Sequence, residues 1–149
     1  MTDSIIKTVE IAAPVERVWD ALIDHEKFGA WFLVAIDQPF AVGQTNTGRM
    51  TYPGYEHFPW ESRTVAIEPM TRFAFEWPAT GGDEDAIKNG VPEWMLVEFV
   101  LEPSATGTTL TVTESGFDKV PEPRRSNVLR SNDGGWTEQM QNIKRYAEG

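Results

Sequence analysis

The chain has 149 residues, of which 40% are hydrophobic and 24% charged, the usual mix of a single globular domain with one core. Thirteen Lys and Arg against 23 Asp and Glu give a net charge of −10, which repels phosphate backbones and makes nucleic acid an unexpected partner. The absence of cysteine excludes disulfides, thiolate catalysis and zinc sites built on sulfur.

The N-terminal part predicts a strand followed by two helices. Ile5 to Ile11 alternates apolar and polar residues, with the period of a half-buried strand. Pro14 suits a first helical turn, and an apolar stripe of helical spacing follows it at Val15, Val18, Trp19 and Leu22. Asp24 can cap a second short helix that leads to Trp31 and Phe32, whose rings we expect to be buried against the sheet. Residues 33–44 predict a loop.

Five further strands are expected, over residues 45–52, 60–68, 72–77, 94–102 and 108–115. Ala79 to Glu93, between the expected strands 72–77 and 94–102, has no periodicity and predicts a mobile, solvated acidic loop. The tip of this loop, Asp83 to Asp85, could gate a cavity. The C-terminal segment, which runs to Glu148, has its apolar residues in helical register and predicts one long helix. Gly134 and Gly135 lie inside that helix, where we expect a kink, a close approach to the sheet or a gap left by the missing side chains.

The order of these elements and four short motifs resemble the START-like superfamily. Ile11 to Leu22 is similar to the opening of such domains, whereas Glu68-Pro69, Thr109 to Phe117 and Gly135-Trp136 resemble the branch related to the activator of heat shock protein 90 ATPase. The resemblance covers essentially the whole chain, residues 1–149, and implies an α+β helix-grip fold. In that fold a curved antiparallel sheet of about six strands is closed by the long C-terminal helix over its concave face. It also implies an apolar cavity between sheet and helix.

Strand alternation predicts a group of charged residues inside the domain. If Val65 and Ile67 point inward, Arg63 and Glu61 share that face, and Glu114 follows Leu110 and Val112 inward. Such a group could orient the polar end of a ligand, and the alternative is a salt bridge at a solvated end of the sheet.

Aromatic side chains supply the other candidate contacts, and they could either line a cavity or fill it as ordinary core. The predicted ligand-binding residues are Trp31, Trp60, Arg63, Phe75, Trp77, Val97, Phe99, Glu114, Trp136 and Met140.

Other kinds of site find little support in the sequence. His25 and His57 lie far apart and neither has a second ligand at helical spacing, so no metal site is expected, although His57 could move protons if it overhangs the cavity. No nucleotide-binding or nucleophile-elbow motif is present, and no cofactor is expected. Met1 to Lys7 does not read as a leader and no run of ~18 apolar residues occurs, so we expect a cytoplasmic protein without membrane insertion.

Three hypotheses about function remain. The first is a small-molecule binding protein that holds an apolar or aromatic ligand, such as a lipid, between the sheet and the last helix. The second is a stress-related regulator or co-chaperone-like protein with a protein partner. The third is an enzyme of cyclase or hydrolase type, which the lack of a recognisable nucleophile and base disfavours.

Overall fold

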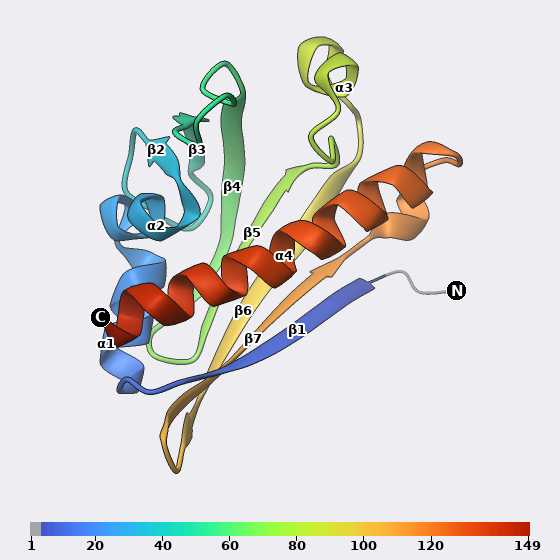
Figure 1. The fold of residues 1–149 in the computed structure, drawn as a ribbon. Helices are drawn as coiled ribbons and strands as arrows, with labels where there is room; N and C mark the ends of the chain where they lie inside the picture. Colours follow the sequence, from blue (N-terminus) through green and yellow to red (C-terminus); the bar gives the residue numbers. More distant parts are fainter. Residues whose placement is uncertain (1–3) are drawn as a thin grey trace.

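A computed structural model describes residues 4–149 as one curved antiparallel sheet with a long helix lying across its concave face (Figure 1). The strand order is β1-β7-β6-β5-β4-β3-β2, and every neighbouring pair is antiparallel. The strands are β1 (Ser4–Ile11), β2 (Val34–Ile36), β3 (Thr45–Met50), β4 (Pro59–Glu68), β5 (Arg72–Pro78), β6 (Trp94–Ser104) and β7 (Gly107–Ser115). The helices are α1 (Val15–Ile23), α2 (His25–Phe32), α3 (Glu84–Asn89) and α4 (Arg124–Glu148), with a 3-10 turn over Phe117–Lys119. The helix-grip fold expected from the sequence is therefore confirmed.

Alternation builds the sheet as the sequence predicted. In β1 the buried side chains are Ile5, Val9 and Ile11, and in β7 every second residue from Thr108 to Glu114 is buried. The two strands pair along their whole length, from Ser4 opposite Ser115 to Ile11 opposite Thr108. Their inner faces form the floor on which α4 lies.

The two short helices form next to the end of β1. The apolar stripe of α1 is buried at Val18, Trp19 and Leu22. Asp24 caps α2 as predicted, because its side chain accepts hydrogen bonds from the backbone N–H groups of Glu26 and Lys27. The helix ends with Trp31 and Phe32 both buried.

Two segments that were expected to be loops contain regular structure. Residues 33–44 include β2, a seventh strand of three residues that pairs with β3. Residues 79–93 include α3, which Asp83 caps by accepting from the backbone N–H of Asp85. Both elements are too short for hydrophobic periodicity to distinguish them from loops.

The predicted inward direction of Glu61, Arg63 and Val65 is wrong. In β4 the buried residues are Trp60, Ser62 and Thr64, whereas Glu61 and Arg63 are exposed and Val65 is 40% exposed. A β-bulge between Thr64 and Ala66 inserts one extra residue against β5. This changes the phase of the strand, so that Ile67 packs against the core although Arg63 points outward.

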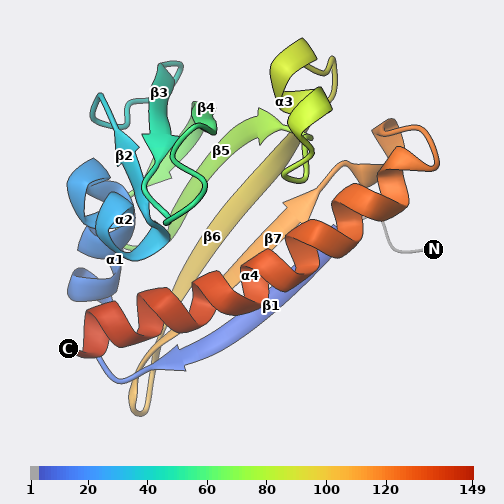
Figure 2. The same ribbon diagram turned by 45° about the horizontal axis from the view of Figure 1, so that its top comes forward.

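Helix α4 crosses the concave face diagonally, from the end of the sheet near α3 to α1 (Figure 2). Its buried face consists of Val128, Trp136, Met140, Ile143 and Ala147. The helix is assigned as continuous through Gly134 and Gly135, and a Cβ atom at either position would meet no atom within 4 Å. The expected close approach to the sheet is therefore wrong, and open space lies beside both glycines.

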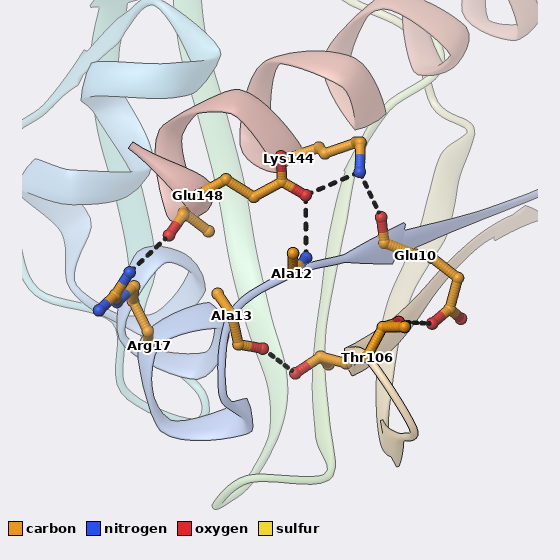
Figure 3. Close-up of polar contacts among 9 residues, drawn as sticks. Glu10, Ala12, Ala13, Arg17, Thr106, Lys144 and Glu148 are labelled. Carbon is orange, nitrogen blue, oxygen red and sulfur yellow. Dashed lines mark hydrogen bonds and ion pairs between the residues drawn. The ribbon is translucent and has the colours of Figure 1, made fainter.

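Polar contacts tie the last turn of α4 to the end of β1 and the start of α1 (Figure 3). The carboxylate of Glu148 accepts a hydrogen bond from the backbone N–H of Ala12 at 2.9 Å. Lys144 Nζ donates to the carbonyl of Glu10 at 2.7 Å and pairs with Glu148, while Arg17 donates to the carbonyl of Ala147. The C-terminal end of α4 is thus fixed to the sheet and to α1.

The interior between α4 and the sheet is largely aromatic. Phe28 contacts five other rings with centroid distances of 4.8–6.3 Å, and Phe73, Phe75 and Phe99 are fully buried. No helix within residues 4–149 is long and apolar enough to cross a membrane.

Candidate functional site

A cavity of about 530 Å³ opens between the segment that contains α3 and the middle of α4. This volume lies in the range of small-molecule sites, which is roughly 300–1,000 Å³. Aromatic and apolar side chains dominate its lining, with a few polar groups from α4. The lining residues are Phe32, Met50, Tyr52, Tyr55, Phe58, Pro59, Trp60, Glu61, Trp77, Pro78, Thr80, Gly81, Gly82, Ala86, Ile87, Gly90, Val91, Trp94, Asn132, Gly135, Glu138, Gln139 and Asn142.

Three walls surround the cavity. One is the connection between β3 and β4, residues 51–58, and a second is the segment 79–93 that contains α3. The third is α4, where Gly135 lines the cavity and leaves open space that any other side chain would occupy. The expectation that the glycine pair leaves a gap is therefore confirmed at Gly135.

The α3 wall is fastened to α4. Arg124 donates to the carbonyl of Ala79 at 2.7 Å and forms an ion pair with Glu93. Ser131 Oγ donates to the carbonyl of Gly81 at 2.7 Å. Across the mouth, His57 of the 51–58 connection contacts Glu84 of α3 at 3.3 Å between Nε2 and Oε1. Both of these side chains are exposed, so His57 lies at the rim, on the side facing α3.

Glu114 lies beneath the cavity, fully buried at the inner face of β7. Its predicted inward direction is confirmed, but its partners are not Arg63 or Glu61. Trp77 Nε1 donates to Oε2 at 2.7 Å, Trp136 Nε1 donates to Oε1 at 2.9 Å, and Asn132 Nδ2 lies 3.0 Å from both oxygens. The carboxylate is therefore held by neutral N–H donors alone.

Burial controls the protonation of this carboxyl group. Removal from water penalises the charged form and raises the pKa of Glu114, while the hydrogen bonds from Trp77, Trp136 and Asn132 oppose the rise. Because Trp77 and Asn132 also line the cavity, the Glu114 cluster (Glu114 with Trp77, Trp136 and Asn132) forms a polar floor beneath an aromatic chamber.

The structure separates the predicted site residues into three groups. Trp60 and Trp77 line the cavity. Arg63 is exposed on the opposite face of β4, and Glu114 lies behind the cavity wall. The others are buried in the core without lining the cavity, namely Trp31, Phe75, Val97, Phe99, Trp136 and Met140. Their rings and chains fill the middle of the interior, so the open volume is displaced toward one end.

Sequence reasoning missed most of the cavity wall. The rings of Tyr52 and Tyr55 meet edge to face in the 51–58 connection. Ile87 lies in α3, and Trp94 is the first residue of β6. These segments carry no periodicity, so the only available signal was a high density of aromatic residues in apparent loops. Within residues 4–149 no cluster of three or more metal-ligating side chains occurs.

A second hollow of about 720 Å³ lies at the opposite end of the sheet, between the start of α1 and the tips of the β4–β5 and β6–β7 hairpins. Although it is larger, its lining contains no aromatic ring and consists of short or aliphatic side chains together with Glu16 and two threonines. The first cavity therefore has the richer chemistry for ligand recognition.

Comparison with known proteins gives a family and a fold. The model of the Activator of Hsp90 ATPase homolog 1-like protein family matches residues 12–148. Protein MLL2253 from Mesorhizobium loti is 22% identical with a TM-score of 0.75, covering 96% of this chain and 95% of that one. Protein NE0264 from Nitrosomonas europaea is 20% identical with a TM-score of 0.74, covering 97% and 94%.

A protein from Arthrobacter aurescens is 20% identical with a TM-score of 0.78, covering 97% of this chain and 86% of that one. At these identities the solved structures show the shared fold alone. No curated protein matches the chain significantly.

Proposed function

The chain belongs to the Activator of Hsp90 ATPase homolog 1-like family, a START-like branch, and on that premise we propose that it is a small-molecule binding protein. The ligand is apolar or aromatic and occupies the cavity between the sheet, the α3 segment and the middle of α4. The observation that carries this proposal is the aromatic chamber of about 530 Å³ above the buried Glu114 cluster. An interior packed mainly for stability would leave few voids larger than a water molecule.

The shape of the chamber supports a flat or elongated ligand. Trp60 and Trp77 approach each other with ring centroids 5.5 Å apart, and Phe32 packs against both. These rings offer a large apolar surface, while Asn132 on the α4 wall offers a polar group for orientation. A ligand would bury its rings against the tryptophans and direct a polar atom toward α4.

The two adjacent glycines of α4 give a matched test of this site. Gly135→Phe places a ring in the cavity, whereas Gly134→Phe adds the same ring one position away, outside the lining. Neither new Cβ meets an atom within 4 Å, so both variants should fold. We expect compounds that raise the Tm of the wild type and of Gly134→Phe to leave the Tm of Gly135→Phe unchanged.

The readout is a thermal-shift screen with lipids, flavonoids, polyketides and other aromatic compounds. A ligand at 100 times its Kd stabilises by about 2.7 kcal/mol, which raises the Tm by roughly 5–10 °C for a domain of this size. A hit that shifts both glycine variants equally binds elsewhere. A broad panel without any hit would remove the proposal and favour the protein-partner alternative.

The two alternative functions have weaker support. A co-chaperone-like role needs a partner surface, yet the large exposed apolar side chains of the sheet, Ile6, Val65 and Val100, lie on strands that are not neighbours. An enzymatic role needs an acid and a base that reach one ligand position, and Glu114 is enclosed by its three N–H donors.

A further inference from the structure

The cavity lining has an uneven balance of charge and of hydrogen-bonding groups. Within the described part of the chain, lysine, arginine and histidine are absent from the lining, whereas Glu61 and Glu138 belong to it. Glu138 is exposed on α4, so its carboxylate lies at the rim and keeps its contact with water. Glu61 lines the cavity from β4 but shares the exposed face of that strand with Arg63, so its carboxylate points away from the chamber. A carboxylate or phosphate ligand would therefore meet the negative charge of Glu138 and no lining cation.

Each of the amide NH₂ groups that α4 contributes to the lining already donates a hydrogen bond within the protein. Asn132 Nδ2 donates to Glu114, Gln139 Nε2 donates to the carbonyl of Phe32 at 3.0 Å, and Asn142 Nδ2 donates to Gln139 Oε1 at 3.1 Å. Since the Nδ2 atom of Asn132 is engaged, its Oδ1 atom is the part of that amide left to meet a ligand. This atom can only accept.

Of the three indoles in the lining, those of Trp60 and Trp77 use their N–H donors in the same way, and Trp94 is the third. Trp60 Nε1 donates to Ser62 Oγ at 3.0 Å and Trp77 Nε1 donates to Glu114. What these two side chains present to the cavity is the π surface of their rings, which attracts cations. The site thus combines the Glu138 carboxylate at the rim, an amide oxygen on α4, aromatic faces, and the hydroxyl groups of Tyr52, Tyr55 and Thr80, which can donate or accept.

From the lack of cationic side chains in this lining, the Glu138 carboxylate and the aromatic faces we infer that the cavity selects an apolar ring system that carries a protonated amine, and discriminates against the corresponding acid. This inference rests on the proposed binding function and specifies its ligand class. The ammonium group donates to Asn132 Oδ1 and lies in the field of Glu138, while the rings pack against Trp60 and Trp77.

Three probes of nearly equal shape test the inference: 2-(2-naphthyl)ethylamine, 2-(2-naphthyl)ethanol and 2-naphthaleneacetic acid at pH 7. By titration calorimetry we expect the amine to bind at least about tenfold more tightly than the acid and several-fold more tightly than the alcohol. Glu138→Gln should weaken the amine by roughly two- to fivefold, the range for exposed charge pairs, and leave the alcohol unchanged. Raising the salt concentration should weaken the amine alone.

Glu102→Gln is the charge-matched control, because Glu102 is exposed near the β6–β7 hairpin at the opposite end of the sheet (Figure 1). It should bind all three probes as the wild type does. Equal or tighter binding of the acid or the alcohol overturns the inference but leaves the proposed function in place, provided that Gly135→Phe blocks the binding. If none of the three probes binds, the amine class is refuted, and the broader thermal-shift panel decides separately on the proposed function.

Discussion

Replacement of Glu114 by Gln should remove a pH-dependent contribution to stability. The side chain is fully buried, and burial raises its pKa above the ordinary value of 4.5 that applies in the unfolded chain. Between these two values the folded protein holds a proton that the unfolded chain releases. The free energy of unfolding therefore falls as the pH rises through this window, and the contribution of protonated Glu114 is complete only below pH 4.5.

The size of this effect follows from the uptake of a single proton by Glu114. Between the unfolded and the folded pKa, the free energy of unfolding can fall by about 1.4 kcal/mol per pH unit, and above the folded pKa this dependence on pH disappears. Gln has nearly the same shape but does not titrate. Its amide NH₂ group cannot accept a hydrogen bond and would face an indole N–H that the carboxylate oxygen accepted. This contact should therefore lower the free energy of unfolding of Glu114→Gln by about 1–3 kcal/mol at every pH.

Urea denaturation of both proteins from pH 5 to pH 8 measures the effect. The difference in unfolding free energy, wild type minus Glu114→Gln, should decrease with rising pH and then become constant. Exposed carboxyl groups with lowered pKa values, such as Glu10 and Glu148, are present in both proteins and cancel in the difference. A difference that stays constant from pH 5, or that rises with pH, would show that the three N–H donors outweigh burial and refute the reasoning.

Three further substitutions test individual contacts of the structure. Trp136→Phe removes one donor to Glu114, and at neutral pH we expect it to cost about 1.5–3 kcal/mol in urea denaturation and to extend the pH window upward. A wild-type stability for this variant would mean that the hydrogen bond contributes nothing. Gly48→Ala should lose more than about 2 kcal/mol, because its Cβ would lie 2.0 Å from the carbonyl oxygen of Ala35, whereas Gly135→Ala should gain up to about 1 kcal/mol from helix propensity. Equal Tm values for these two alanine variants would contradict the structure.

The sequence predicted the strands and helices whose apolar residues recur at regular spacing, because that spacing determines which face is buried. The alternation in residues 5–11 and 108–115 was enough to place the buried face of β1 and β7, and with it Glu114. The helical register of α4 likewise gave its buried face. In each case the period of the side chains repeats several times, so that local noise does not change the result.

Prediction failed where a single residue changes the phase or where contacts come from distant segments. The bulge at Val65 and Ala66 has no sequence signal, and it invalidated the phase argument for Arg63. The partners of Glu114 come from β5 and α4, 37 and 22 positions away along the chain for Trp77 and Trp136. The cavity wall consists of irregular segments, whose positions depend on tertiary contacts such as Arg124 to Ala79.

The fastening of the cavity walls at a few points has a consequence for protein engineering. Residues 51–58 and 79–93 shape the chamber, yet the aromatic core beneath them is held by strands and by α4. Replacing either segment, with Arg124 and Ser131 kept as attachment points, would change the chamber without disturbing the packing under it. The domain is therefore suited as a starting scaffold for directed evolution of binders, in which the library is confined to two short stretches of chain.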